Sequence, residues 1–213
     1  MTRVKICGIT NIEDALHAEA CGADALGFVF AESPRRIDAA RAGEIIARLG
    51  PFITPVGVFV DPTEDEVSGA AESGIRIAQI HGATGGEDSP LLHVLPTIRA
   101  LQVRDAQSLA PIPAFCPRPK AVLLDAYWEG LEGGTGKTFD WELAASASRF
   151  GIPIVLAGGL DEENVSEAIA RVRPYGVDAS SRLEASPGRK DPSKVERFIR
   201  AVRRCDAATP YLE

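Results

Sequence analysis

Short apolar runs recur along the chain at intervals of about 20 to 35 residues, the length of one strand, loop and helix. Each run is rich in β-branched residues and ends in polar residues or glycines. The runs are continuously apolar instead of alternating, which is typical of parallel strands that are buried on both faces. We therefore predict eight strands, at residues 3–7, 25–30, 55–60, 77–81, 98–103, 121–125, 153–157 and 175–179.

Amphipathic segments between the runs predict helices, and several of them have recognisable ends. Residues 10–13 (TNIE) have the spacing of a capping box at the start of the first helix, and Gly22 lies where that helix would end. Residues 63–66 (TEDE) repeat the capping-box spacing before the third helix. Asp191, followed by Pro192, predicts the start of the last helix.

A strand followed by a helix, repeated eight times, predicts a (β/α)8 TIM barrel, an α/β fold that would fill residues 1–213 as a single domain. A doubly wound open sheet is the alternative. The number of strands and the absence of a G-x-G-x-x-G motif after the first run favour the barrel. Two helices are expected to be weak, because residues 82–90 leave little room and residues 110–119 contain four prolines.

The composition and charge of the chain indicate which kinds of molecule it can bind. The 213 residues include 23 lysines and arginines against 30 aspartates and glutamates, and the formal charge of −7 argues against nucleic-acid binding while allowing a local anion pocket. No apolar run is long enough for a membrane span or a signal peptide, so we expect no membrane partner and a cytoplasmic protein. The four cysteines lack C-x-x-C spacing, which indicates free thiols and no metal site.

In a TIM barrel the chemistry lies at the carboxyl ends of the strands, so the polar residues there are the candidates for catalysis. Cys7 ends the first run, before Gly8, which would let a ligand approach the backbone. A small buried apolar residue is the other interpretation of Cys7. Asp125 ends the sixth run, where apolar surroundings favour a protonated carboxyl, the form of a general acid. A helix cap or a loop anchor is the alternative for Asp125.

The loops after the last two strands predict a phosphate site. Gly158 and Gly159 follow the seventh strand, with Asp161 expected to open the next helix, and Ser180 and Ser181 follow the eighth. Glycines expose backbone N–H groups, and a helix N-terminus favours an anion. Glycines that serve only packing are the alternative.

Other polar residues near strand ends have less specific roles. Asp178 lies at the end of the eighth strand, and Arg35 after the second could hold a carboxylate with its planar guanidinium or be solvated surface. His81, at the end of the fourth strand, is interpreted as a pocket-lining residue. Lys5 and Lys137 raise the possibility of Schiff-base chemistry, but neither has the desolvated strand-end position that this needs.

Taken together, these segments resemble the phosphoribosylanthranilate isomerase family, barrel enzymes of tryptophan biosynthesis. The likeness extends from one end of the chain to the other in family order, which makes it far more specific than any single motif. The matching segments are residues 4–10 (VKICGIT), 22–30 (GADALGFVF), 33–35 (SPR), 56–60 (VGVFV), 79–82 (QIHG), 133–141 (GGTGKTFDW), 156–160 with 164–165, and 187–188 with 190–191.

The resemblance implies an Amadori rearrangement of N-(5-phosphoribosyl)anthranilate, a small phosphorylated substrate, without a cofactor. It implies that Asp125 is the general acid that opens the ribose ring and that Cys7 is the general base that removes the C2 proton. A thiolate base at neutral pH needs a lowered pKa, which a neighbouring cation or N–H dipoles would supply. The substrate-binding residues that the resemblance implies are Arg35 for the anthranilate carboxylate, Asp178 for the ribose, and Gly158, Gly159, Ser180 and Ser181 for the phosphate.

One position departs from the family pattern, because Arg182 stands where the family has glycine. An arginine there would cost on the order of 1 kcal/mol of strain if the backbone needed a positive φ. We expect activity to survive, although a barrel that binds a phosphorylated metabolite without turnover is an alternative. A second alternative is the related aminoaldose isomerase of the histidine pathway, whose two aspartates, as the family comparison implies, disagree with Cys7. Both a monomer and a homodimer remain open.

Overall fold

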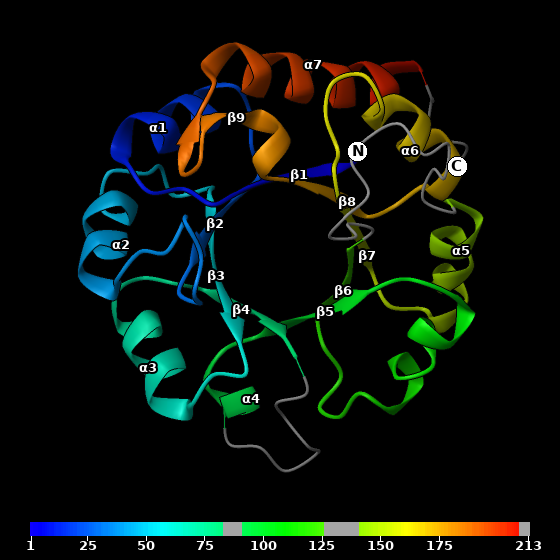
Figure 1. Cartoon of the computed structure of the whole chain (residues 1–213), viewed down its shortest axis with the longest axis horizontal. Helices are drawn as coiled ribbons and strands as arrows, with labels where there is room; N and C mark the ends of the chain where they lie inside the picture. The colour runs from blue at the N-terminus through cyan, green and yellow to red at the C-terminus, as the bar shows by residue number, and fades with distance from the viewer. Residues whose placement is uncertain (83–90, 126–140, 209–213) are drawn as a thin grey trace.

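The computed structural model describes residues 1–82, 91–125 and 141–208, and its centre is a closed barrel of eight parallel strands (Figure 1). Strands that follow one another in sequence are neighbours in the barrel, and β1 pairs with β8 to close it. The predicted barrel is therefore confirmed. The strands are β1 (Arg3–Cys7), β2 (Ala25–Val29), β3 (Thr54–Val60), β4 (Ile77–His81), β5 (Thr97–Gln102), β6 (Ala121–Asp125), β7 (Ile154–Ala157) and β8 (Gly176–Ala179).

The strands are continuously apolar because both of their faces are buried. Ala100 of β5, Leu123 of β6 and Val155 of β7 pack against one another in the barrel interior. Val122 and Leu124, which alternate with Leu123 along β6, belong to the larger core between the barrel and the helices. Burial of each large apolar side chain contributes roughly 1.5 to 3 kcal/mol, so both layers stabilise the barrel.

Helices surround the barrel (Figure 1). The two units with weak helical signals differ as predicted, because α4 is a single turn and only 3-10 turns, η1 (Ala106–Leu109) and η2 (Ile112–Ala114), occupy the proline-rich segment after β5. Among the helices of the described ranges, none has the length and apolar character needed to cross a membrane. The helices are α1 (Ile12–Ala20), α2 (Ala39–Ile46), α3 (Glu64–Glu72), α4 (Leu91–Val94), α5 (Trp141–Ser146), α6 (Val165–Val172) and α7 (Pro192–Ala208).

The first helix begins one residue later than its capping-box spacing suggests. Asn11, not Thr10, is the N-cap, and its side chain accepts the backbone N–H of Asp14. Thr10 is used elsewhere, because its hydroxyl donates to the backbone oxygen of Gly188, 2.5 Å away. The capping box at residues 63–66 and the helix start after Asp191 are confirmed.

An antiparallel hairpin between β8 and α7 has no counterpart among the predicted elements. It follows the short 3-10 helix η4 (Ser181–Leu183) and consists of β9 (Glu184–Ser186) and β10 (Arg189–Lys190). Its turn packs beside the loop after β2, since a methyl group at Gly188 would lie 3.3 Å from the oxygen of Pro34. The hairpin therefore brings Glu184 and Lys190 close to the end of the barrel where the predicted site residues lie. Residues 133–140 of the family-like GGTGKTFDW segment lie outside the described ranges.

Candidate active site

A cluster of ionisable groups lies inside the barrel around Cys7. Lys5 and Cys7 are two residues apart on β1, so they share one face of the strand, and both are buried. Lys5 Nζ donates to Oδ1 of Asp178, which lies opposite it on β8, at 3.0 Å. A methyl group at Gly27 of β2 would lie 2.7 Å from Cys7 Sγ and 3.1 Å from Lys5 Nζ. The absence of a side chain at Gly27 thus leaves room for the thiol and the ammonium group beside each other.

The charges of this cluster act on the thiol in opposite directions. Burial raises the pKa of Cys7, the ammonium group of Lys5 lowers it, and the carboxylate of Asp178 raises it again. The net pKa of Cys7 is raised, so the lowered pKa expected for a thiolate base is not found. Burial lowers the pKa of Lys5, but Asp178 and Cys7 outweigh burial and raise it overall. Lys5 is therefore a stable cation at neutral pH.

Asp125 ends β6, and Cys7 ends β1, three strands away around the closed barrel. Asp125 is half-buried and pairs with Gln102 of β5 and Ala157 of β7. Its backbone oxygen accepts the N–H of Val103 at 3.0 Å. The carboxyl is thus carried by a rigid strand end next to fully buried apolar residues, as the sequence pattern predicts.

Arg35, in the loop after β2, extends across the same end of the barrel. A methyl group at Gly8 would lie 2.6 Å from its Cδ, so the side chain passes directly over this glycine. The guanidinium donates from Nε and Nη2 to the two carboxylate oxygens of Glu184, each at 2.7 Å. Its neighbour Arg36 forms an exposed ion pair with Glu32 at 3.3 Å instead. Of these two arginines, Arg35 is the one that joins the candidate site.

The ends of β7 and β8 carry the predicted phosphate-binding residues. Gly158 and Gly159 have φ values of 96° and 68°, backbone conformations that favour glycine. The hydroxyl of Ser180 donates to the backbone oxygen of Cys7 at 3.1 Å and so links the ends of β8 and β1. Ser181 is exposed and begins η4. The loop after β8 therefore borders the cluster around Cys7.

The helix after β7 starts later than the sequence suggests. Asp161 does not open the helix; its Oδ1 accepts the N–H groups of Glu163 and Asn164 in a turn. The helix α6 begins at Val165, after Asn164. The side chain of Asn164 donates to the oxygen of Gly159 at 2.9 Å, so it holds the glycine loop directly.

His81 is held by an amide from its own strand. Its Nε2 atom lies 2.9 Å from Nε2 of Gln79. Burial lowers the pKa of His81, and the nearby charge of Lys5 lowers it further, so the ring is neutral and accepts the amide N–H. Within the described ranges, Oε1 of Gln79 is buried without a hydrogen-bond donor. His81 and Gln79 therefore add polar groups to the barrel interior.

Arg182 lies in η4 with an exposed side chain. Among the described non-glycine residues, only Asp61 and Arg173 have a positive φ. The strain expected for an arginine in place of a flexible glycine is therefore absent.

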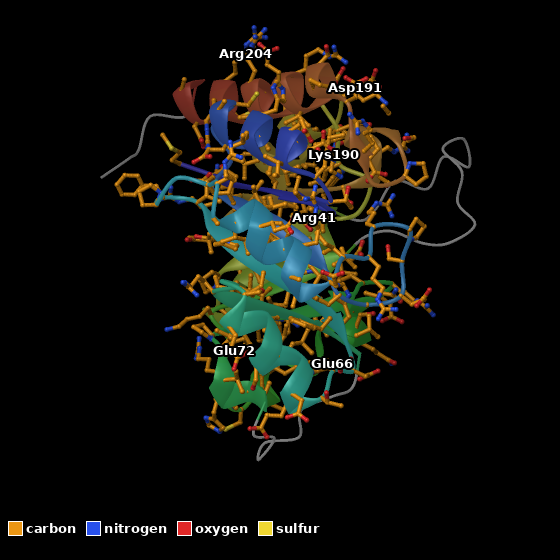
Figure 2. All side chains as sticks on the ribbon, turned by 90° about the vertical axis from the view of Figure 1, so that its left-hand side faces the viewer. Arg41, Glu66, Glu72, Lys190, Asp191 and Arg204 are labelled. Atoms are coloured by element: carbon orange, nitrogen blue, oxygen red, sulfur yellow. The ribbon has the colours of Figure 1, made fainter. Side chains whose placement is uncertain are left out.

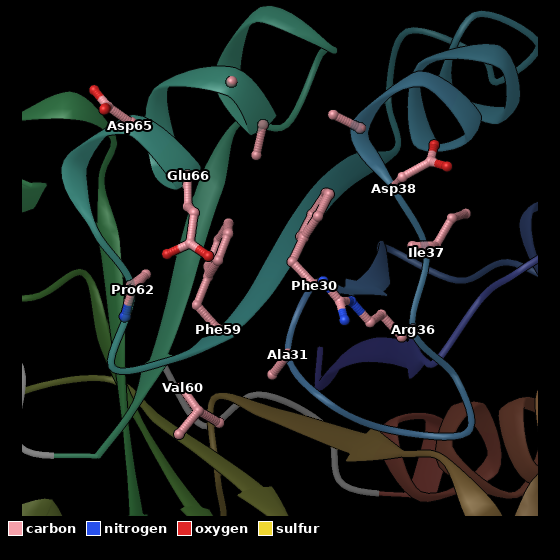
Figure 3. Close-up of a pocket in the computed structure, with 13 residues that line it drawn as sticks. Phe30, Ala31, Arg36, Ile37, Asp38, Phe59, Val60, Pro62, Asp65 and Glu66 are labelled. Carbon is pink, nitrogen blue, oxygen red and sulfur yellow. The ribbon is translucent and has the colours of Figure 1, made fainter.

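A separate cavity of about 280 Å³ lies outside the barrel, between α2 and α3 (Figure 3). The rings of Phe30 and Phe59 stack there with centroids 5.1 Å apart, and Arg36 and Asp38 lie beside them. Its lining comes from β3, α2, α3 and the loops after β2 and β3, and it includes neither Cys7 nor Asp125. This cavity is distinct from the cluster inside the barrel.

The sequence reasoning missed three charged residues of the site. Lys5 lies in the middle of a predicted strand and not at its end, and Glu184 and Lys190 lie away from the predicted strand ends. A charged side chain in a buried strand needs a partner of opposite charge, so the position of Lys5 in an apolar run is itself a signal of a buried ion pair. No comparable signal marks Glu184 and Lys190, because their positions depend on the hairpin.

Comparison with known proteins identifies close relatives over nearly the whole chain. A family model described as N-(5'phosphoribosyl)anthranilate (PRA) isomerase matches residues 4–201. A protein of Geobacter sp. (strain M21) named N-(5'-phosphoribosyl)anthranilate isomerase is 51% identical over 204 residues, 93% of this chain and 97% of that protein. A structure of monomers generated from the dimeric isomerase of Thermotoga maritima has a TM-score of 0.83 and 35% identity, covering 95% of this chain and 99% of that one. A solved structure of phosphoribosyl anthranilate isomerase in complex with reduced 1-(o-carboxyphenylamino)-1-deoxyribulose 5-phosphate has a TM-score of 0.81 and 36% identity. It covers 95% of this chain and 99% of that one.

Proposed function

The chain belongs to the N-(5'-phosphoribosyl)anthranilate isomerase family, and we propose that Asp125 and Cys7 are its general acid and general base. Its activity is the isomerisation of phosphoribosylanthranilate in tryptophan biosynthesis. The observation that carries the proposed roles is the placement of a buried thiol and a half-buried carboxyl at the carboxyl ends of β1 and β6 in one barrel. Both groups are carried by rigid strands, as acid–base catalysis requires.

In the first step, Asp125 donates a proton to the ring oxygen of the ribose. The bond between C1 and the ring oxygen breaks as the nitrogen lone pair forms a C1=N bond, which gives an open-chain protonated Schiff base. The strand that ends at Asp125 supports this role, because its buried apolar side chains hold the carboxyl at a fixed place at the carboxyl end of the barrel.

In the second step, the thiolate of Cys7 removes the proton from C2. The electron pair of the C2–H bond forms a C1=C2 bond while the C=N electrons return to nitrogen, giving an enolamine. Protonation of C1 and loss of the C2 hydroxyl proton then yield the ketone. Lys5 supports this step because its charge favours the thiolate against the opposing effect of burial.

The remaining residues provide the binding site. Arg35 would bind the anthranilate carboxylate, because a guanidinium has N–H groups on more than one edge and Glu184 occupies the Nε and Nη2 edge. Asp178, oriented by Lys5, would accept hydrogen bonds from ribose hydroxyls. His81 would line the pocket beside them. The phosphate would lie against the backbone of Gly158, Gly159, Ser180 and Ser181.

The test of this proposal is turnover of freshly prepared phosphoribosylanthranilate, followed by the loss of its fluorescence. We expect the purified protein to accelerate the loss well beyond spontaneous decay and to yield the ketone product. A protein that binds the reduced product analogue but does not turn the substrate over would contradict the proposed acid–base roles.

Replacing Arg182 with glycine is expected to change kcat/KM by less than about threefold, because an exposed side chain without backbone strain contributes little. The same fluorescence assay measures this. An increase of tenfold or more, on the order of 1.4 kcal/mol, would instead show that the arginine obstructs the phosphate site.

We also propose that the protein is a homodimer, joined at the amino-terminal end of the barrel. Phe52, before β3, is 95% exposed and borders a cavity of about 280 Å³ that Ile77, Ile98 and Val155 help to line. A large exposed aromatic beside a cavity that apolar side chains line in part is typical of a self-complementary contact, and the Thermotoga maritima relative is described as dimeric.

Replacing Phe52 with serine is expected to convert the dimer into a monomer in analytical ultracentrifugation, because the contact would lose its exposed aromatic. Val60→Ser is the matched control, since Val60 is also an exposed apolar residue but lies at the carboxyl end of β3. A wild-type protein that is already monomeric at about 10 μM, a concentration at which a typical stable dimer is intact, would contradict the dimer.

A further inference from the structure

The side chain of Glu184 is a buried anchor behind Arg35. Its carboxylate is only 5% exposed and accepts both hydrogen bonds of the Arg35 fork. Oε1 also accepts from Lys190 Nζ at 3.1 Å and from the backbone N–H of Gly188 at 3.3 Å. The Arg35 guanidinium is therefore fixed by a carboxylate that is itself fixed by the hairpin.

Lys190 is the second cation on this carboxylate. It lies just before α7 (Figure 2). Its side chain is 2% exposed. Nζ also donates to the backbone oxygen of Ser180 at 3.2 Å, and the backbone N–H of Lys190 donates to Asp14 at 2.7 Å. Lys190 thus connects the anchor of Arg35 to a loop of the proposed phosphate site.

The net charge of Arg35, Glu184 and Lys190 determines how strongly this part of the site attracts an anion. Arg35 and Glu184 alone would form a neutral pair, with a buried carboxylate close to an incoming anion. The ammonium group of Lys190 compensates Glu184, so the three side chains carry one net positive charge. Charge is screened weakly at buried positions, so one charge strongly affects anion binding here.

We propose that Glu184 and Lys190 are positioning residues that give the site its preference for a substrate carrying an aromatic carboxylate. Glu184 orients the guanidinium so that its remaining N–H groups meet the carboxylate, and Lys190 cancels the negative charge of Glu184. This inference rests on the role of Arg35 given under the proposed function. It predicts that Lys190 controls selectivity without touching the substrate carboxylate.

The test compares the dissociation constants of two ligands. One is reduced 1-(o-carboxyphenylamino)-1-deoxyribulose 5-phosphate, and the other is its counterpart made from aniline, which lacks the carboxylate. Lys190→Met is expected to reduce the preference for the carboxylate at least about tenfold while the affinity for the aniline compound changes less than about threefold. A purely structural role of Lys190 would weaken both ligands alike, and that result would overturn the inference.

Further variants separate charge from folding. Lys194→Met is the matched control, because among the described residues Lys194 donates to the backbone oxygen of Glu184, at 3.0 Å, and not to its carboxylate, so this variant should keep the wild-type preference. The double variant Lys190→Met/Glu184→Gln restores the net charge and should recover part of the preference; a further loss would overturn the charge argument. Lys190→Gln replaces Lys190→Met if the latter does not fold.

The variant Arg35→Gln tests the proposed role of Arg35 separately from the inference about Lys190. If this variant keeps the wild-type preference for the carboxylate, the proposed role of Arg35 itself is wrong. If Arg35→Gln abolishes the preference while Lys190→Met retains it, the role of Arg35 stands and only the inference about Lys190 fails.

Discussion

Replacing Cys7 with alanine is expected to lower kcat/KM for phosphoribosylanthranilate about 10³-fold, because the variant lacks the group that removes the C2 proton. Cys7 is buried but small, so the loss of its sulfur should cost only on the order of 1 kcal/mol of folding stability. Steady-state fluorescence assays measure the effect. Cys205→Ala is the control, because this half-buried thiol of α7 is remote from the barrel interior and its loss should leave the rate within about twofold.

The pH profile gives a second readout of the same residue. Burial raises the pKa of Cys7, so the thiolate is the minor form at neutral pH and its fraction grows as pH rises. The ratio of the wild-type kcat/KM to that of Cys7→Ala should therefore increase between about pH 6.5 and 9, with a slope approaching tenfold per unit, because both enzymes keep Asp125 and only the wild type needs the thiolate. A Cys7→Ala variant that retains more than a tenth of the activity, or the wild-type slope, would exclude Cys7 as the base.

Replacing Asp125 with asparagine is expected to lower kcat by about 10³-fold, because an amide of the same shape has no acidic proton to give to the ribose oxygen. The change leaves the strand pairing of β6 intact, since Asp125 contributes its backbone to both neighbouring strands. The fluorescence assay under saturating substrate measures the loss.

Two measurements show whether that loss is chemical. The affinity for the reduced product analogue should stay within about threefold of wild type, because binding uses other residues. Asp105→Asn, which alters an exposed carboxylate capping η1, should leave kcat unchanged. If Asp125→Asn retained most of its activity, the acid would have to be another group.

The barrel could be predicted because burial on both faces makes parallel strands continuously apolar. This signal places β1, β4 and β6 at the predicted bounds and the other strands within one residue. Helix ends are harder, because several polar residues compete to cap them. Asn11 prevails over Thr10 because Thr10 bonds to Gly188, a residue 178 positions away that no local pattern reveals.

The positions of candidate residues could be predicted where a polar residue directly ends an apolar strand. Cys7 and Asp125 are of this kind, because the bounds of β1 and β6 alone place them at the carboxyl end of the barrel. Partners could not be predicted, because they come from distant segments: Lys5 pairs with Asp178 across 173 positions, and Arg35 pairs with Glu184 across 149. The base role that the resemblance implies for Cys7 needs a lowered pKa, whereas burial raises the pKa of this thiol.

The most direct test of the central claim is to trap the open-chain Schiff base with cyanoborohydride on the two single variants. Asp125 acts before Cys7 in this account, so Cys7→Ala should open the ring and yield the reduced open-chain amine faster than buffer does. Asp125→Asn should yield it only at the buffer rate, because its ring stays closed. Trapping on Asp125→Asn but not on Cys7→Ala, or on neither, would contradict the assigned roles of the two residues.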